Sequence, residues 1–203
     1  MEKLKSNLPN MAIVLTFVAV LCSGILAAVN GATSATIEEQ KEKSLADGIK
    51  AVMQSDDVKV LGDTVITKDF NGKSFEFTVH QTDKGVAVES IGPNSFGGGL
   101  KVLIGFSNEG EILGYTILET AETPGLGAKA QEWFQKGAKG DIIGKNAKND
   151  NLTVSKDGGD VDAITASTIT SRAFLAAVTQ AWAAYKGDAS ADANTGASPQ
   201  VNE

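Results

Sequence analysis

The sequence has very little of what most catalytic and metal sites are built from. It contains one cysteine, Cys22, and one histidine, His80, among 203 residues. A single cysteine excludes an internal disulfide and any multi-cysteine zinc or iron–sulfur site within this chain. A Ser-His-Asp arrangement or a histidine–metal centre would have to use His80. We therefore expect no catalytic residue and no metal site.

The surroundings of His80 favour an ordinary strand residue. The stretch KSFEFTVHQ alternates apolar and polar residues, which predicts a half-buried strand with His80 on its solvent face. A nucleophile elbow is missing as well, since GPNSFG around Ser95 has one residue too many for G-x-S-x-G. A hydrolase is poorly supported.

Dense positive charge is also missing. The formal net charge is -7, and no run of Lys or Arg would neutralise a phosphate backbone. We expect no nucleic-acid partner.

What the sequence does have is one long apolar run near its N-terminus. Residues 11–29, MAIVLTFVAVLCSGILAAV, carry no charge and would span about 28 Å as a helix, close to the hydrocarbon thickness of a bilayer. The alternative is a cleaved signal peptide, whose apolar region is usually about 7–15 residues long. The length favours a retained transmembrane helix, and Lys3 and Lys5 before it predict a cytoplasmic tail.

The rest of the chain predicts an α+β fold. An amphipathic helix is expected within residues 32–54, with Thr36 and Glu39 as a capping box at its start. Strands are expected at 73–81, 85–90, 100–106 and 111–118, with SNEGE as a hairpin turn. A short helix at 128–137 and a strand and turn within 150–160 follow. A final helix from Thr170 to Lys186 should bury five large side chains, those of Phe174, Leu175, Val178, Trp182 and Tyr185. Strands in the middle and helices at both ends indicate a mainly antiparallel sheet with flanking helices.

The stretch GLGAKA, residues 125–130, matches the dinucleotide fingerprint G-x-G-x-x-A. A lone match is weak, because the repeating βαβ pattern that gives it meaning is missing. Pro124 before it favours a rigid turn that leads into a helix.

A second stretch, DVDAITASTITSRAF, holds five hydroxyl side chains within seven residues: Thr165, Ser167, Thr168, Thr170 and Ser171. It lies where the final helix begins, and a helix N-terminus offers unpaired N–H groups that suit a phosphate. The alternative is a helix start with redundant capping residues.

These residues carry a family resemblance. DAITASTITS resembles the motif in which FMN is esterified through its phosphate to a threonine, and ETPGLGAKAQEWF, residues 122–134, resembles the second signature of the same FMN-binding domain. With the N-terminal apolar helix, the chain resembles the G subunit family of the Rnf ion-translocating oxidoreductase complex. The related family is the C subunit of the sodium-translocating NADH:quinone reductase.

The resemblance implies a site. Thr168 would carry the covalent FMN as a phosphoester, and Asp162 would help present the segment to the flavin transferase. Thr165 and Ser167 would donate hydrogen bonds near the phosphate. Thr123, Leu126 and Gly127 would lie against the flavin. Two positions depart from the motif, because Ala166 stands where glycine is usual and Ser167 where alanine is usual.

The resemblance also implies a function and an organisation. The chain would be an electron-carrier subunit without catalysis of its own, in a membrane complex that couples electron transfer between ferredoxin and NAD to ion translocation. Its partners would be the other subunits, a flavin transferase and membrane lipid. The expected parts are a cytoplasmic tail (1–10), a transmembrane helix (11–29), a stalk (30–55), a periplasmic FMN-binding domain (56–186) and a disordered tail (187–203). The rival is an anchored extracytoplasmic binding or assembly module without a redox role.

Overall fold

The computed structural model describes residues 8–187. Lys3, Lys5 and nearly all of the expected C-terminal tail lie outside the described residues. The first element is a single long helix, α1 (Leu8–Val52), which contains the whole apolar run. Every side chain of residues 11–29 is exposed, and among the described residues α1 is the one helix long and apolar enough to cross a membrane. It is the candidate membrane span.

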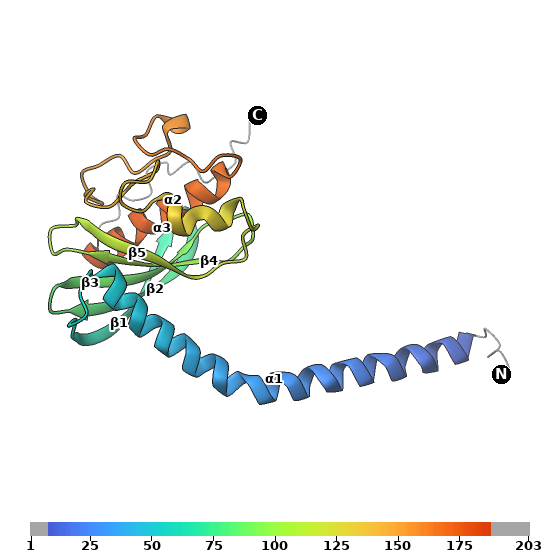
Figure 1. Ribbon diagram of the computed structural model, residues 1–203. Coiled ribbons are helices and arrows are strands. Elements are labelled where there is room, and N and C mark those ends of the chain that lie inside the picture. Colours follow the sequence, from blue (N-terminus) through green and yellow to red (C-terminus); the bar gives the residue numbers. More distant parts are fainter. Residues whose placement is uncertain (1–7, 188–203) are drawn as a thin grey trace. The chain divides into compact units, whose positions relative to one another are not determined.

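Five strands follow as a simple meander: β1 (Val60–Phe70), β2 (Lys73–Thr82), β3 (Gly85–Gly92), β4 (Leu100–Phe106) and β5 (Ile112–Glu119). Their order in the sheet equals their order in the chain, and each neighbouring pair is antiparallel. Short turns join the strands, as an antiparallel meander allows. The α+β fold with an antiparallel sheet is confirmed (Figure 1).

The last helix, α3 (Thr168–Lys186), covers one face of this sheet and forms the main core with it. Four of its five predicted core residues are buried, and Tyr185 is only half-buried. Phe174 is central, because its ring stacks on Phe134 at 4.3 Å and meets the edge of Tyr115 at 4.7 Å. These contacts hold α3 against the short helix α2 (Ala130–Trp133).

The opposite face of the sheet carries a smaller core made with the end of α1. Ile49, Val52 and Met53 pack there against Ala87 and Leu103. The end of α1 approaches the strands closely because small residues face it. An added Cβ at Gly105 would lie 2.4 Å from the Val52 carbonyl oxygen. Among the described residues, those from 45 to 187 belong to one compact unit.

Two expectations about individual elements are wrong, and one strand was missed. No helix begins at Thr36, because α1 runs through that position without a break. Strand β1 was not expected. Residues 150–160 form no strand, and instead contain the 3₁₀ turn η2 (Ser155–Asp157) with one isolated bridge between Val154 and Val161.

Candidate functional site

The start of α3 is preceded by a tight turn. Ala166 has a φ of 61°, the left-handed conformation that L-residues adopt at a cost, and the Ser167 N–H donates to the Ile164 carbonyl at 3.0 Å. The Ser171 hydroxyl closes this turn from inside the helix. It donates to the Ser167 carbonyl and accepts from the Ile164 N–H, both at 2.9 Å.

The Ser167 side chain occupies the N-cap position of α3, yet within residues 8–187 it makes no capping hydrogen bond. Because the hydroxyl of the cap residue is not used as a cap, redundant capping does not explain this cluster of hydroxyl groups.

The second signature forms a turn before the 3₁₀ turn η1 (Gly127–Lys129) and α2. Gly125 has a φ of 78°, and the N–H groups of Leu126 and Ala128 both donate to the Thr123 carbonyl. A rigid structural turn is therefore the correct interpretation of GLGAKA, because the antiparallel sheet offers no βαβ unit for a dinucleotide fold.

Two hydrogen bonds join the two signatures. The buried Thr170 hydroxyl donates to Glu122 Oε2 at 2.8 Å across 48 residues of sequence. The indole N–H of Trp133 donates to the Asp162 carbonyl at 2.8 Å. Gly127 sits against the first of these bonds, since an added Cβ would lie 2.3 Å from Glu122 Oε2 and 2.7 Å from Thr170 Oγ1. The glycine is required by this packing, whatever else the site holds.

Between the two signatures lies a pocket of about 340 Å³, within the range of small-molecule sites. The loop after β3 supplies one further wall through Phe96, and the Gly97 N–H donates to the other oxygen of Glu122 at 3.2 Å. The residues that line the pocket are Phe96, Glu122, Thr123, Leu126, Gly127, Ala166, Ser167, Thr168, Ile169 and Thr170.

The structure brings five of the seven predicted site residues to this pocket, namely Thr123, Leu126, Gly127, Ser167 and Thr168. Thr165 and Asp162 do not line it. Both are exposed, and Asp162 accepts a hydrogen bond from the Ser155 hydroxyl at 3.2 Å. Their roles as a phosphate neighbour and a transferase contact stay predictions.

Sequence reasoning missed other residues of the pocket. Phe96, Leu126 and Ile169 are apolar yet 72%, 42% and 50% exposed. Of these only Leu126 was expected at the site. The available indication was Phe96 in SFGGG, an aromatic residue directly before three glycines. Glu122 was recognised as part of the turn, but its buried side chain was not foreseen.

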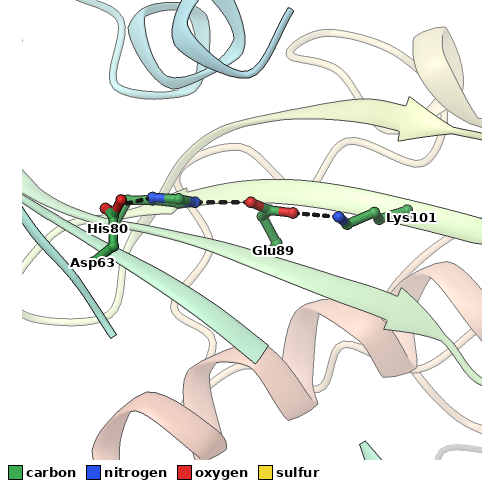
Figure 2. A network of polar contacts seen from close by, with 4 residues as sticks. All are labelled: Asp63, His80, Glu89 and Lys101. Carbon is green, nitrogen blue, oxygen red and sulfur yellow. Dashed lines mark hydrogen bonds and ion pairs between the residues drawn. The ribbon is translucent and has the colours of Figure 1, made fainter. Parts of the chain in front are cut away.

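The prediction that His80 faces solvent is wrong, since the residue is 3% exposed. Its cross-strand neighbour Ala87 belongs to the core that α1 covers, so the sheet is buried on both faces here. Figure 2 shows that His80 is part of a polar row, between Asp63 at 2.7 Å and Glu89 at 2.9 Å. None of the residues of this row lines the pocket.

Comparison with known proteins identifies the domain that contains the pocket. The family model described as FMN-binding domain matches residues 95–183, which include every lining residue of the pocket. A second family model, the RnfG N-terminal region, matches residues 1–52. The part of the chain that forms the pocket is an FMN-binding domain.

Relatives match over most of both chains. The G subunit of the ion-translocating oxidoreductase complex of Shewanella baltica (strain OS223) is 31% identical over 191 residues, which is 88% of this chain and 89% of the relative. The protein of the same name from Escherichia coli (strain K12) is 33% identical over 180 residues, 83% of this chain and 86% of the relative. The chain therefore belongs to the family of G subunits of ion-translocating oxidoreductase complexes.

The residues of the pocket fit FMN. Its exposed apolar side chains suit a planar aromatic ring, and burying them under such a ring would remove apolar surface from water. Hydroxyl groups at Ser167 and Thr168 line the same pocket, where a phosphate would find donors. A cation also approaches, because Lys156 Nζ lies 3.4 Å from Thr168 Oγ1.

Proposed function

We propose that the chain is an electron-carrier subunit that holds FMN through a phosphoester bond to Thr168. Bound flavin supplies the redox chemistry, and the protein supplies its position and its electrostatic surroundings. The observation that carries the proposal is the pocket between the two signatures, where Thr168 lies among exposed apolar side chains.

The surroundings of the hydroxyls favour Thr168 as the acceptor. Thr168 lines the pocket and is partly exposed, so a transferase can reach its hydroxyl. Ser167 is 9% exposed, and Thr165 lies outside the pocket lining. The Thr170 hydroxyl is already bonded to Glu122, and that of Ser171 closes the turn.

The bond requires an activated flavin, since a hydroxyl does not condense with a free phosphate in water. A flavin dinucleotide with a pyrophosphate bond, brought by a flavin transferase, meets this need. The bond between Thr168 Oγ1 and phosphorus forms, and the pyrophosphate P–O bond breaks. The nucleoside monophosphate leaves with the bridging oxygen, and the hydroxyl proton passes to a base of the transferase.

In the complex, this subunit would pass electrons along a path between ferredoxin and NAD that is coupled to ion translocation. The other subunits would bind those substrates. Residues 11–29 would cross the membrane and residues 30–55 would form a stalk. The FMN-binding domain would then lie on the periplasmic side, where covalent attachment prevents loss of the cofactor.

The acceptor is tested by substitution of single hydroxyls. Thr168→Val keeps the β-branched shape and removes only the hydroxyl, so the full chain should fold and lose all flavin fluorescence in a denaturing gel. Ser167→Ala should be labelled like the parent. A fluorescent Thr168→Val with a dark Ser167→Ala would move the acceptor to Ser167. A parent that stays dark with an active transferase would favour a binding or assembly module instead.

A further inference from the structure

The 3₁₀ turn η2 directs three consecutive side chains at residues 160–174, the acceptor segment. Ser155 Oγ donates to Asp162 Oδ1 at 3.2 Å, and Lys156 Nζ approaches Thr168 Oγ1 at 3.4 Å. Asp157 receives two hydrogen bonds from the Arg172 guanidinium, each of 2.7 Å. We propose that Lys156 is the residue that neutralises the phosphoester formed on Thr168. This inference rests on the proposed function.

The backbone that carries Lys156 is fixed, although its side chain is exposed. Val154 and Val161, on either side of the turn, are buried in the main core. The Ser155 N–H donates to the Val161 carbonyl and the Asp157 N–H to the Val154 carbonyl, both at 2.8 Å. An exposed lysine on a free loop loses much entropy when it binds an anion, whereas here the chain beneath it is already ordered.

The ion pair between Asp157 and Arg172 attaches this turn to α3, the helix that starts with Thr168. A bidentate guanidinium–carboxylate contact fixes orientation as well as distance. The hydrogen bonds from Arg172 hold the pKa of Asp157 below its usual value, so the pair stays charged at neutral pH. Arg172 is thereby committed to Asp157, and Lys156 is the cation that points at the acceptor hydroxyl.

The charge of the surroundings favours such a cation. The chain has a net charge of -7, and the buried Glu122 carboxylate lines the same pocket. A phosphate esterified at both ends carries one negative charge, which this carboxylate would repel. The contact of 3.4 Å is long for a hydrogen bond, so the contribution of Lys156 is its positive charge near the oxygen that becomes esterified.

Lys156 would therefore assist the attachment reaction through its positive charge. Negative charge gathers on the phosphoryl group while the flavin is transferred, and a nearby ammonium group stabilises it. Because this cation is exposed, its effect should be modest and weakened by salt.

The test measures the initial rate of covalent flavin incorporation into the full-length protein in detergent. The reaction contains a purified flavin transferase and a flavin dinucleotide. Lys156→Gln should lower the rate about two- to fivefold, the range of exposed charge interactions. Lys156→Glu should lower it further, and Lys156→Arg should restore most of it. Lys148→Gln is the matched control, because it removes the same charge from another exposed lysine.

Salt separates an electrostatic effect from a structural one. The ratio of the parent rate to the Lys156→Gln rate should approach one as ionic strength rises. Equal rates for parent, Lys156→Gln and Lys156→Glu at low salt would overturn the inference. The proposed function would survive equal rates if Thr168→Val takes up no covalent flavin in the same experiment. If the parent itself takes up no flavin, the proposed function fails first.

Discussion

Ala166 is a residue whose backbone conformation does not suit its side chain. Its φ of 61° is a conformation that costs an L-residue about 1–2 kcal/mol relative to glycine. The turn keeps this conformation because Ser167 and Ser171 close it with hydrogen bonds. The left-handed turn also explains physically why glycine is usual at this position of the motif.

Ala166→Gly should therefore stabilise the protein. Relief of the left-handed strain exceeds the chain entropy that glycine adds, about 0.5–1 kcal/mol, so a net gain of roughly 0.5–1 kcal/mol is expected. Ala166→Val should destabilise by about 1 kcal/mol or more, because a β-branched residue tolerates this region poorly. Chemical denaturation of the full chain in detergent measures both. A less stable glycine variant would show that the turn is not strained.

At the scale of single residues, the sequence predicted those that belong to contiguous motifs. Thr123, Leu126, Gly127, Ser167 and Thr168 all reach the pocket. The reason for Gly127 was not predictable, because it depends on Glu122 and Thr170 meeting across 48 residues.

Lys156 and Phe96 were missed for a related reason. Each lies on a different loop, and only the packing of α3 against the sheet brings those loops to the acceptor segment.

At the scale of elements, a polar row crosses four neighbouring strands of the sheet (Figure 2). Asp63 on β1 contacts His80 on β2, which contacts Glu89 on β3, and Glu89 pairs with Lys101 on β4 at 2.5 Å. Burial alone would lower the pKa of His80. Hydrogen bonds and charge from Glu89 and Asp63 outweigh burial and raise that pKa above 6.5.

The pKa of Glu89 is shifted in the opposite direction. Burial would raise the pKa of its carboxyl group, but hydrogen bonds and charges from His80 and Lys101 outweigh this effect and lower the pKa below 4.5. The row is therefore most stabilising when His80 is protonated and Glu89 is ionised.

The row predicts how stability changes with pH. The pKa of His80 is higher in the folded than in the unfolded chain, so protonated His80 stabilises the fold. This stabilisation is complete below pH 6.5 and is lost as the pH rises through the folded pKa. The stabilisation by ionised Glu89 is complete above pH 4.5 and is lost as the pH falls through the folded pKa of Glu89. The free energy of unfolding should thus fall as the pH rises from about 6 to about 8. This interval contains the ordinary histidine pKa of about 6.5 and extends above it.

His80→Gln is the direct control, because His80 is the only histidine in the chain. In this variant, the free energy of unfolding should change little between those two pH values. In Glu89→Gln the decrease should be smaller than in the parent, because the imidazole ring has lost one charged partner. An unchanged slope in His80→Gln would contradict the assignment.

The elements that sequence reasoning missed lack periodicity. Strand β1 is exposed along most of its length, so no alternation of apolar and polar residues identifies it. The stretch around η2 has apolar residues at Leu152, Val154 and Val161 that look like a strand. They instead anchor a compact loop in the main core. The four strands that do alternate or lie buried were predicted correctly.

At the scale of the whole molecule, the charges before the apolar run predict the side of the membrane on which the FMN-binding domain lies. The length of the run favours a retained anchor, and Lys3 and Lys5 before it favour an orientation with the domain outside. Protease added to cells with a permeable outer membrane should digest the domain, while a cytoplasmic marker stays intact. Mature protein that begins after about residue 30, as signal cleavage would give, refutes the anchor.

A digest with trypsin shows whether one particular hydroxyl carries the flavin, and which one. Cleavage after Lys156 and Arg172 releases residues 157–172, a peptide that holds all five hydroxyls of the acceptor segment. From protein matured with its transferase, this peptide should carry the added mass of FMN less one water. Fragmentation should place that mass on Thr168. The added mass on Ser167 would contradict the assignment of the acceptor, and a peptide of unmodified mass would contradict the covalent flavin itself.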